Sequence, residues 1–123
     1  MIRIEGTQPI LSVSDMKQSL HFYCDILGFN AAEWGSENFT SVNKDGGGIY
    51  LCKGAQGQPG TWVWVGFDGD INIFYSYLLS HNVTVLHPPV NYSWAQELQV
   101  EDPDGHILRF GKEPDAALPF ADQ

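Results

Sequence analysis

Histidine is the side chain that most often binds metal ions and transfers protons near neutral pH. The chain has four of them: His21, His81, His87 and His106. No two have the spacing of a metal-ligand pair, and the first two fall on or beside expected helices. We interpret all four as surface or hydrogen-bonded structural residues, although the role of His106, beside an expected turn, stays open.

Acid–base and nucleophilic catalysis also lack an obvious residue set. Tyr50 and Glu97 are the acid or base candidates, but neither paired carboxylates nor a nucleophile beside a base is present. The Gly46-Gly47-Gly48 run is more simply a hairpin turn than a phosphate loop. Cys24 and Cys52 fall in regular segments, outside any C-x-x-C pair, so we expect free buried thiols.

The charge balance narrows the choice of partners. Fifteen acidic residues against six basic ones give a formal charge of −9, which repels nucleic acid and anionic membranes. This charge favours cationic ligands, with an acidic surface that serves only solubility as the alternative. The sequence has no run of about 18 apolar residues and no signal peptide pattern at its start, so we expect a soluble cytoplasmic protein.

The first half of the chain has the pattern of a strand, a helix and three strands. Asp15 follows an apolar strand at 9–13 and is placed to cap a helix, because Gln18 stands three residues further on. Apolar residues at helical spacing continue to Leu27, and Gly28 ends the helix. Turn residues then separate three expected strands, at about 30–34, 38–43 and 48–53.

The second half repeats this order after a Gly-rich stretch. A strand begins at Thr61, and Asp70 is placed to cap a helix with Ile71, Phe74 and Leu78 on its apolar face. Asp102-Pro103-Asp104-Gly105 is a type I turn signal between the last two strands. The expected strands lie at 83–86, about 92–100, and 106–111. The tail after them is either loose or packed as an arm.

The repeated order predicts an α+β fold of two βαβββ modules forming a curved mixed sheet of eight strands, with both helices on one face and a cupped cleft on the other. We expect a single domain over residues 1–123. Its parts are module 1 at about 8–53, a linker at 54–60, module 2 at about 61–111 and a tail at 112–123.

Two stretches resemble a known superfamily. Residues 9–29 carry D-x-x-x-S-x-x-F-Y-x-x-x-L-G-F after a strand, and residues 97–111 carry the D-P-D-G hairpin. Together they resemble the opening and closing signatures of the vicinal oxygen chelate superfamily, which contains glyoxalase I, bleomycin resistance proteins and extradiol dioxygenases. The resemblance covers most of residues 8–111 and also implies a homodimer.

In this superfamily the metal enzymes take one ligand from the first and one from the last strand of each module. The resemblance places Gln8, Tyr50, Trp62 and Arg109 at these positions. Gln is a permitted ligand, but the other three are not, and a fixed guanidinium charge repels a divalent cation. We therefore expect no catalytic metal and no other cofactor, which resembles the metal-free bleomycin resistance proteins most closely.

Strand alternation places Trp62 and Trp64 on the cleft face and the intervening Val63 on the helix face. Core or dimer packing is the alternative for both tryptophans. Arg109 either clamps an anionic ligand group or neutralises a carboxylate such as Glu97 or Glu101. The predicted ligand-binding residues are Gln8, Phe39, Tyr50, Trp62, Trp64, Trp94 and Arg109, with Tyr92 as a further candidate.

These features predict a binding protein that sequesters a drug or metabolite in an aromatic cleft without chemistry. The alternative is a glyoxalase-like lyase or isomerase, or a dioxygenase, that uses a divalent metal. A purely structural interaction module is a third hypothesis, and it requires a filled cleft.

Overall fold

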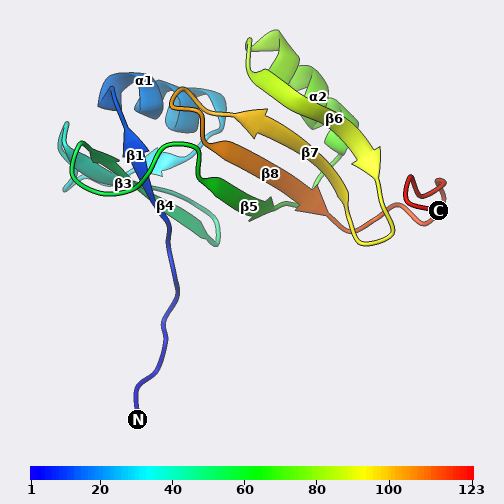
Figure 1. Cartoon of the computed structure of the whole chain (residues 1–123), viewed down its shortest axis with the longest axis horizontal. Coiled ribbons are helices and arrows are strands. Elements are labelled where there is room, and N and C mark those ends of the chain that lie inside the picture. Colours follow the sequence, from blue (N-terminus) through cyan, green and yellow to red (C-terminus); the bar gives the residue numbers. More distant parts are fainter. The chain divides into compact units, whose positions relative to one another are not determined.

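The computed structural model describes all 123 residues, which divide into two compact units at 1–59 and 60–123. Each unit contains one four-stranded mixed sheet with a helical segment (Figure 1). The predicted α+β class with two βαβββ modules is confirmed. Hydrogen bonding divides the eight strands into two sheets of four, and the boundary between the units lies at the end of the predicted linker.

The two units share one topology. In the first, the elements are β1 (Ile10–Val13), α1 (Met16–Leu20), η1 (His21–Ile26), β2 (Asn30–Ala31), β3 (Phe39–Lys44) and β4 (Gly47–Lys53). In the second, they are β5 (Trp62–Gly66), α2 (Ile71–Ser80), β6 (Thr84–Asn91), β7 (Gln96–Glu101) and β8 (Ile107–Lys112). The sheet orders are β1-β4-β3-β2 and β5-β8-β7-β6. β1 runs parallel to its neighbour β4, and β5 runs parallel to its neighbour β8. This repeated order supports a duplication of one module.

Both helices begin where the sequence predicts. Asp15 accepts a hydrogen bond from the Gln18 amide at 3.2 Å, and Asp70 accepts bonds from the Asn72 and Ile73 amides at 2.8 and 3.0 Å. These side chains satisfy N–H groups that lack a partner within the helix. Gly28, after the first helix, has a φ of +82°, which is costly for other residues.

The first helix is not α-helical throughout, which corrects the prediction. From His21 to Ile26 it widens into a π-helix, in which the Leu27 amide reaches the Phe22 carbonyl at 3.0 Å. A regular α-helix turns by about 100° per residue, so consecutive side chains point in different directions. Phe22 and Tyr23 are nevertheless both buried. The wider turn accompanies the burial of both rings.

Three strand predictions also need correction. The expected strand 30–34 ends at Ala31, because the Gly35 amide bonds the Ala32 carbonyl at 3.2 Å and turns the chain. The expected strand 83–86 continues to Asn91 through two prolines. This is possible because β6 is an edge strand with two register shifts. The expected strand 92–100 begins only at Gln96 and contains no bulge.

In the second unit, α2 covers one face of the sheet. Phe110 of β8 lies edge-on to Phe74 of α2, with ring centroids 4.9 Å apart, and Leu98 and Leu108 are buried on the same face. Residues of opposite parity, among them Glu97 and Arg109, therefore lie on the helix-free face. That face carries the site described below.

The C-terminal tail packs as an arm rather than remaining loose. The Asn91 side chain donates to the Asp115 carbonyl at 2.9 Å and accepts from the Asp115 amide at 2.9 Å. The Ala121 amide donates to the Asn91 carbonyl at 2.8 Å. Figure 1 shows the tail beside the turn between β6 and β7.

Both cysteines are free, Cys52 buried and Cys24 half-buried. None of the helices has the length and apolar character needed to cross a membrane.

Candidate aromatic binding site

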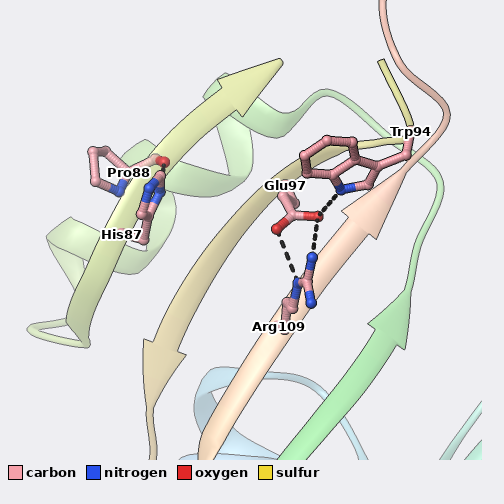
Figure 2. A network of polar contacts seen from close by, with 5 residues as sticks. All are labelled: His87, Pro88, Trp94, Glu97 and Arg109. Carbon is pink, nitrogen blue, oxygen red and sulfur yellow. Dashed lines mark hydrogen bonds and ion pairs between the residues drawn. The ribbon is translucent and has the colours of Figure 1, made fainter. Parts of the chain in front are cut away.

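An ion pair lies at the centre of the helix-free face in the second unit. Arg109 donates from Nε to Glu97 Oε1 at 2.9 Å and from Nη2 to Oε2 at 3.2 Å (Figure 2). Glu97 is only 4% exposed, so its carboxylate needs this partner. The hydrogen bond from Arg109 to Glu97 is the main cause that raises the pKa of the guanidinium. Of the two alternatives for Arg109, the internal partner is therefore observed.

The ion pair connects two tryptophans. Trp94 Nε1 donates to Glu97 Oε2 at 3.3 Å, as Figure 2 shows, while the Arg109 guanidinium lies 5.4 Å from the centre of the Trp64 ring. Trp94 also stacks on Tyr92, with centroids 4.5 Å apart and planes within 6° of parallel. Each indole is thus held by a polar or ring contact and still offers surface to solvent.

Gly111 gives Trp64 room to lie on the sheet. A Cβ atom at this position would fall 2.0 Å from the Trp64 ring, well inside contact distance. At Gly66, in contrast, the nearest Trp64 atom would be 3.5 Å away, an ordinary contact. The absence of a side chain at 111 therefore sets the orientation of the indole.

A hollow of about 470 Å³ opens beside the two indoles. Trp64 and Trp94 line it together with Phe67, and Asp68 and Glu113 stand on its rim as exposed carboxylates. Lys112 also lines the hollow, but its ammonium donates to the Gly69 carbonyl and lies 5.9 Å from the Phe67 ring centre. The hollow thus offers aromatic surfaces, two carboxylates and one cation that is already hydrogen-bonded.

The first unit has an aromatic cluster of its own. Phe39 of β3 and Tyr50 of β4 are diagonal neighbours, because Phe39 pairs with Cys52 and Tyr50 with Ser41. Their rings stack with centroids 5.4 Å apart, and Trp34 stacks on Phe39 at 6.2 Å. Gln8 lies over Gly48, where a Cβ atom would come within 2.8 Å of its carboxamide. Of the residues predicted for module 1, Phe39 and Tyr50 therefore come together, whereas Gln8 lies beside Gly48, two residues before Tyr50 on β4.

Sequence reasoning missed Trp34 because it assigned that residue to a strand, whereas it lies in the loop after Ala31. Trp64, Trp94 and Arg109 of the second unit do come together, whereas Trp62 is 59% exposed and does not line the hollow. Tyr92, the further candidate, stacks on Trp94 but does not line the hollow.

The side chains at the ligand positions of the metal enzymes do not fit a metal ion. In the second unit, an indole stands at Trp62 and a guanidinium at Arg109, and neither supplies a lone pair to a divalent cation. In the first unit, Gln8 and Tyr50 supply two oxygens at most. No group of three or more His, Cys, Asp or Glu side chains gathers anywhere in the chain. The four positions therefore lack a metal donor set.

Each histidine has a local role. His21 pairs with Asp25 at 2.9 Å, His87 contacts the Pro88 carbonyl at 2.8 Å (Figure 2), and His81 stacks on Tyr77. His106 is fully buried, and its Nδ1 accepts from the Thr61 amide at 3.0 Å. The open question about His106 is thus answered by a structural role, joining the starts of β5 and β8.

A second hollow, of about 620 Å³, lies on the helix side of the first unit. His21, Cys24 and Asp25 line it from η1, and Ser36 and Glu37 from the loop opposite. Burial, followed by the charge of Asp25, raises the pKa of the Cys24 thiol. Because the thiolate is the reactive form, Cys24 is a poor nucleophile.

Comparison with known proteins identifies the family. The family model for the Glyoxalase/Bleomycin resistance protein/Dioxygenase superfamily matches residues 7–110. The chain belongs to this superfamily. The predicted resemblance is thereby confirmed, and the match spans both βαβββ modules. No curated protein sequence gives a significant match.

Solved structures of the superfamily fold are similar over nearly their whole length. A virulence protein from Salmonella typhimurium has a TM-score of 0.78 at 21% identity, covering 92% of this chain and 99% of its own. An integron cassette protein from the mobile metagenome of the Halifax Harbour sewage outfall has a TM-score of 0.75 at 28% identity, with 89% and 99% covered. TnmS3, an antibiotic binding protein from Streptomyces sp. CB03234, has a TM-score of 0.75 at 21% identity, with 94% and 100% covered.

Proposed function

We propose that this superfamily member is a small-molecule-binding protein that holds a planar, cationic organic compound against Trp64 and Trp94 and performs no chemistry on it. The observation that carries the proposal is the hollow between these indoles. Both rings are about half exposed, at 52% and 57%, although the Glu97–Arg109 pair holds them in place. Large aromatic surfaces kept ordered and exposed are typical of a ligand site.

The charges favour a cation. Asp68 and Glu113 on the rim add a local negative potential to the net charge of −9, whereas Lys112 is already hydrogen-bonded. Indole faces also attract cations. TnmS3, a protein with this fold, is an antibiotic binding protein, which agrees with sequestration of a drug or metabolite.

We propose further that binding needs no metal or other cofactor. The alternative, a lyase, isomerase or dioxygenase, depends on a divalent metal, and the chain lacks donors at two of its four ligand positions, Trp62 and Arg109. By relation to bleomycin resistance proteins, we also propose a homodimer that works in the cytoplasm.

The test combines metal analysis with a binding titration. Purified protein is dialysed against traces of Zn, Ni, Mn and Fe and analysed for bound metal, and its tryptophan fluorescence is titrated with bleomycin. We expect no stoichiometric metal and a saturable quench that Trp64→Ala weakens at least about tenfold, as for a buried aromatic contact. Leu79→Ala on α2 is the matched control, because Leu79 is similarly exposed at 49% and lies outside the hollow.

Two results would contradict the proposal. About one metal ion per chain would favour the enzyme alternative. Equal quenching in the Trp64→Ala and Leu79→Ala variants would place the bleomycin outside the hollow.

A further inference from the structure

The turn that carries Trp94 is attached to the end of the chain. Ser93, between the stacked Tyr92 and Trp94, donates from its amide to Asp122 Oδ1 at 2.8 Å and from its hydroxyl to Oδ2 at 2.6 Å. One carboxylate therefore holds both donors of the residue at the tip of the turn. These hydrogen bonds are the main causes that lower the pKa of Asp122.

The tail is also anchored to Asn91, the last residue of β6. Asn91 bonds both the amide and the carbonyl of Asp115, and its own carbonyl accepts from the Ala121 amide. This anchor brings Asp122 to Ser93 across 29 residues of sequence. Residues 113–123 thus form an ordered arm with two attachment points, which we call the C-terminal clasp.

Without the clasp, few contacts fix the turn. The Tyr92 amide donates to the Ala95 carbonyl at 2.9 Å, and Trp94 reaches Glu97 through a long bond of 3.3 Å. Trp94 is 57% exposed, so burial holds its ring only in part, and its stacking partner Tyr92 lies in the same turn. A short exposed turn with so few contacts samples several conformations, which costs ordering free energy when a ligand binds.

We propose that the C-terminal clasp is a positioning element, in which Asp122 fixes Ser93 and so orders the stacked Tyr92–Trp94 pair, of which Trp94 forms one wall of the hollow. The effect on affinity rests on the function proposed above, whereas the ordering of Trp94 does not. Asp122 and Ser93 do not contact the ligand in this proposal. They act through Trp94 alone.

The test uses three variants of the full chain. Asp122→Ala removes both acceptors, Asp122→Asn keeps an acceptor for the Ser93 amide, and Glu5→Gln is the control because it removes one exposed negative charge outside the clasp. The near-UV circular dichroism of Trp94 is obtained in each background as the difference between the variant and the same variant carrying Trp94→Phe. Bleomycin affinity is measured in parallel.

In the Asp122→Ala variant, we expect the Trp94 difference signal to fall by at least about half and the Kd for bleomycin to rise roughly three- to tenfold, the range for two exposed hydrogen bonds. Asp122→Asn should restore part of both, and the unfolding midpoint should stay close to that of Glu5→Gln. A Trp94 signal in Asp122→Ala equal to that of the control would overturn the proposal. If the unaltered protein binds no bleomycin, bleomycin is excluded as the ligand in the proposed function, while the circular dichroism still decides whether the clasp orders Trp94.

Discussion

Arg109 and Glu97 neutralise each other across neighbouring strands, with Nε and Oε1 2.9 Å apart, at a position where metal enzymes of the superfamily have a ligand. Arg109, whose charge would repel a metal ion, instead holds Glu97, and the Glu97 carboxylate also accepts a hydrogen bond from Trp94 Nε1. The pair thereby contacts both indoles, Trp94 through Glu97 and Trp64 through Arg109.

Removing Arg109 leaves a buried carboxylate without its cation. We expect Arg109→Leu to lower the free energy of unfolding by roughly 1–3 kcal/mol, below the cost for a fully buried pair because Arg109 is 38% exposed. The double variant with Glu97→Leu should recover much of this loss, since both charges are then gone. Urea denaturation measures both, and a single variant that is as stable as the parent protein would contradict the assignment.

Adding one methyl group under Trp64 should disturb the site. In Gly111→Ala the new Cβ would fall 2.0 Å from the indole, so the ring must move and bleomycin affinity should fall by at least about fivefold. Gly66→Ala is the matched control, because its Cβ meets Trp64 at 3.5 Å. Fluorescence titration compares them, and equal affinities would show that the orientation of Trp64 is unimportant.

The contribution of the rim carboxylates to binding should fall as ionic strength rises. We expect Asp68→Asn with Glu113→Gln to weaken the binding of cationic bleomycin roughly two- to fivefold at low salt, and less at 0.5 M salt because exposed charges are screened. Glu5→Gln with Glu33→Gln changes the net charge equally at exposed positions outside the hollow. The same salt dependence in both double variants would assign the effect to the overall charge.

Cys24 should react slowly with iodoacetamide at neutral pH. Burial, then the charge of Asp25, raises the pKa of its thiol, so the thiolate fraction at a given pH is smaller than for an ordinary cysteine and grows as pH rises. Asp25→Asn removes the second cause and should speed alkylation. Mass spectrometry locates the label, and a reaction as fast as that of a free cysteine peptide would contradict this expectation.

The hydrogen bonds between Asp122 and Ser93 should persist to low pH. Because Ser93 lowers the pKa of Asp122 in the folded protein, the link is complete above the ordinary Asp pKa and is lost as pH falls through the lowered value. The Trp94 circular dichroism signal should therefore persist to a pH below the ordinary Asp pKa. In Asp122→Asn this transition should be absent, and an identical acid transition would assign it to another group.

Local signals along the chain are enough to predict the order of its helices and strands. Helix caps at Asp15 and Asp70, the alternation around Val63 and the turn at 102–105 predict both modules, and the superfamily signatures agree with them. Local signals failed where pairing decides the outcome. The prolines of β6 are tolerated because the strand lies at a sheet edge, and the π-helix from His21 accompanies burial of adjacent rings.

Tertiary structure alone decided the site. Sequence parity placed Trp64 and Arg109 on one face and left Glu97 and Glu101 as candidate partners for Arg109. The side-chain contacts of the folded chain select Glu97 and place Gly111 beneath Trp64. The tail has no periodicity, and its attachment to Ser93 depends on side-chain bonds that span 29 residues. Contacts between distant segments depend on how the strands and loops meet in space, and no local preference of the chain encodes that.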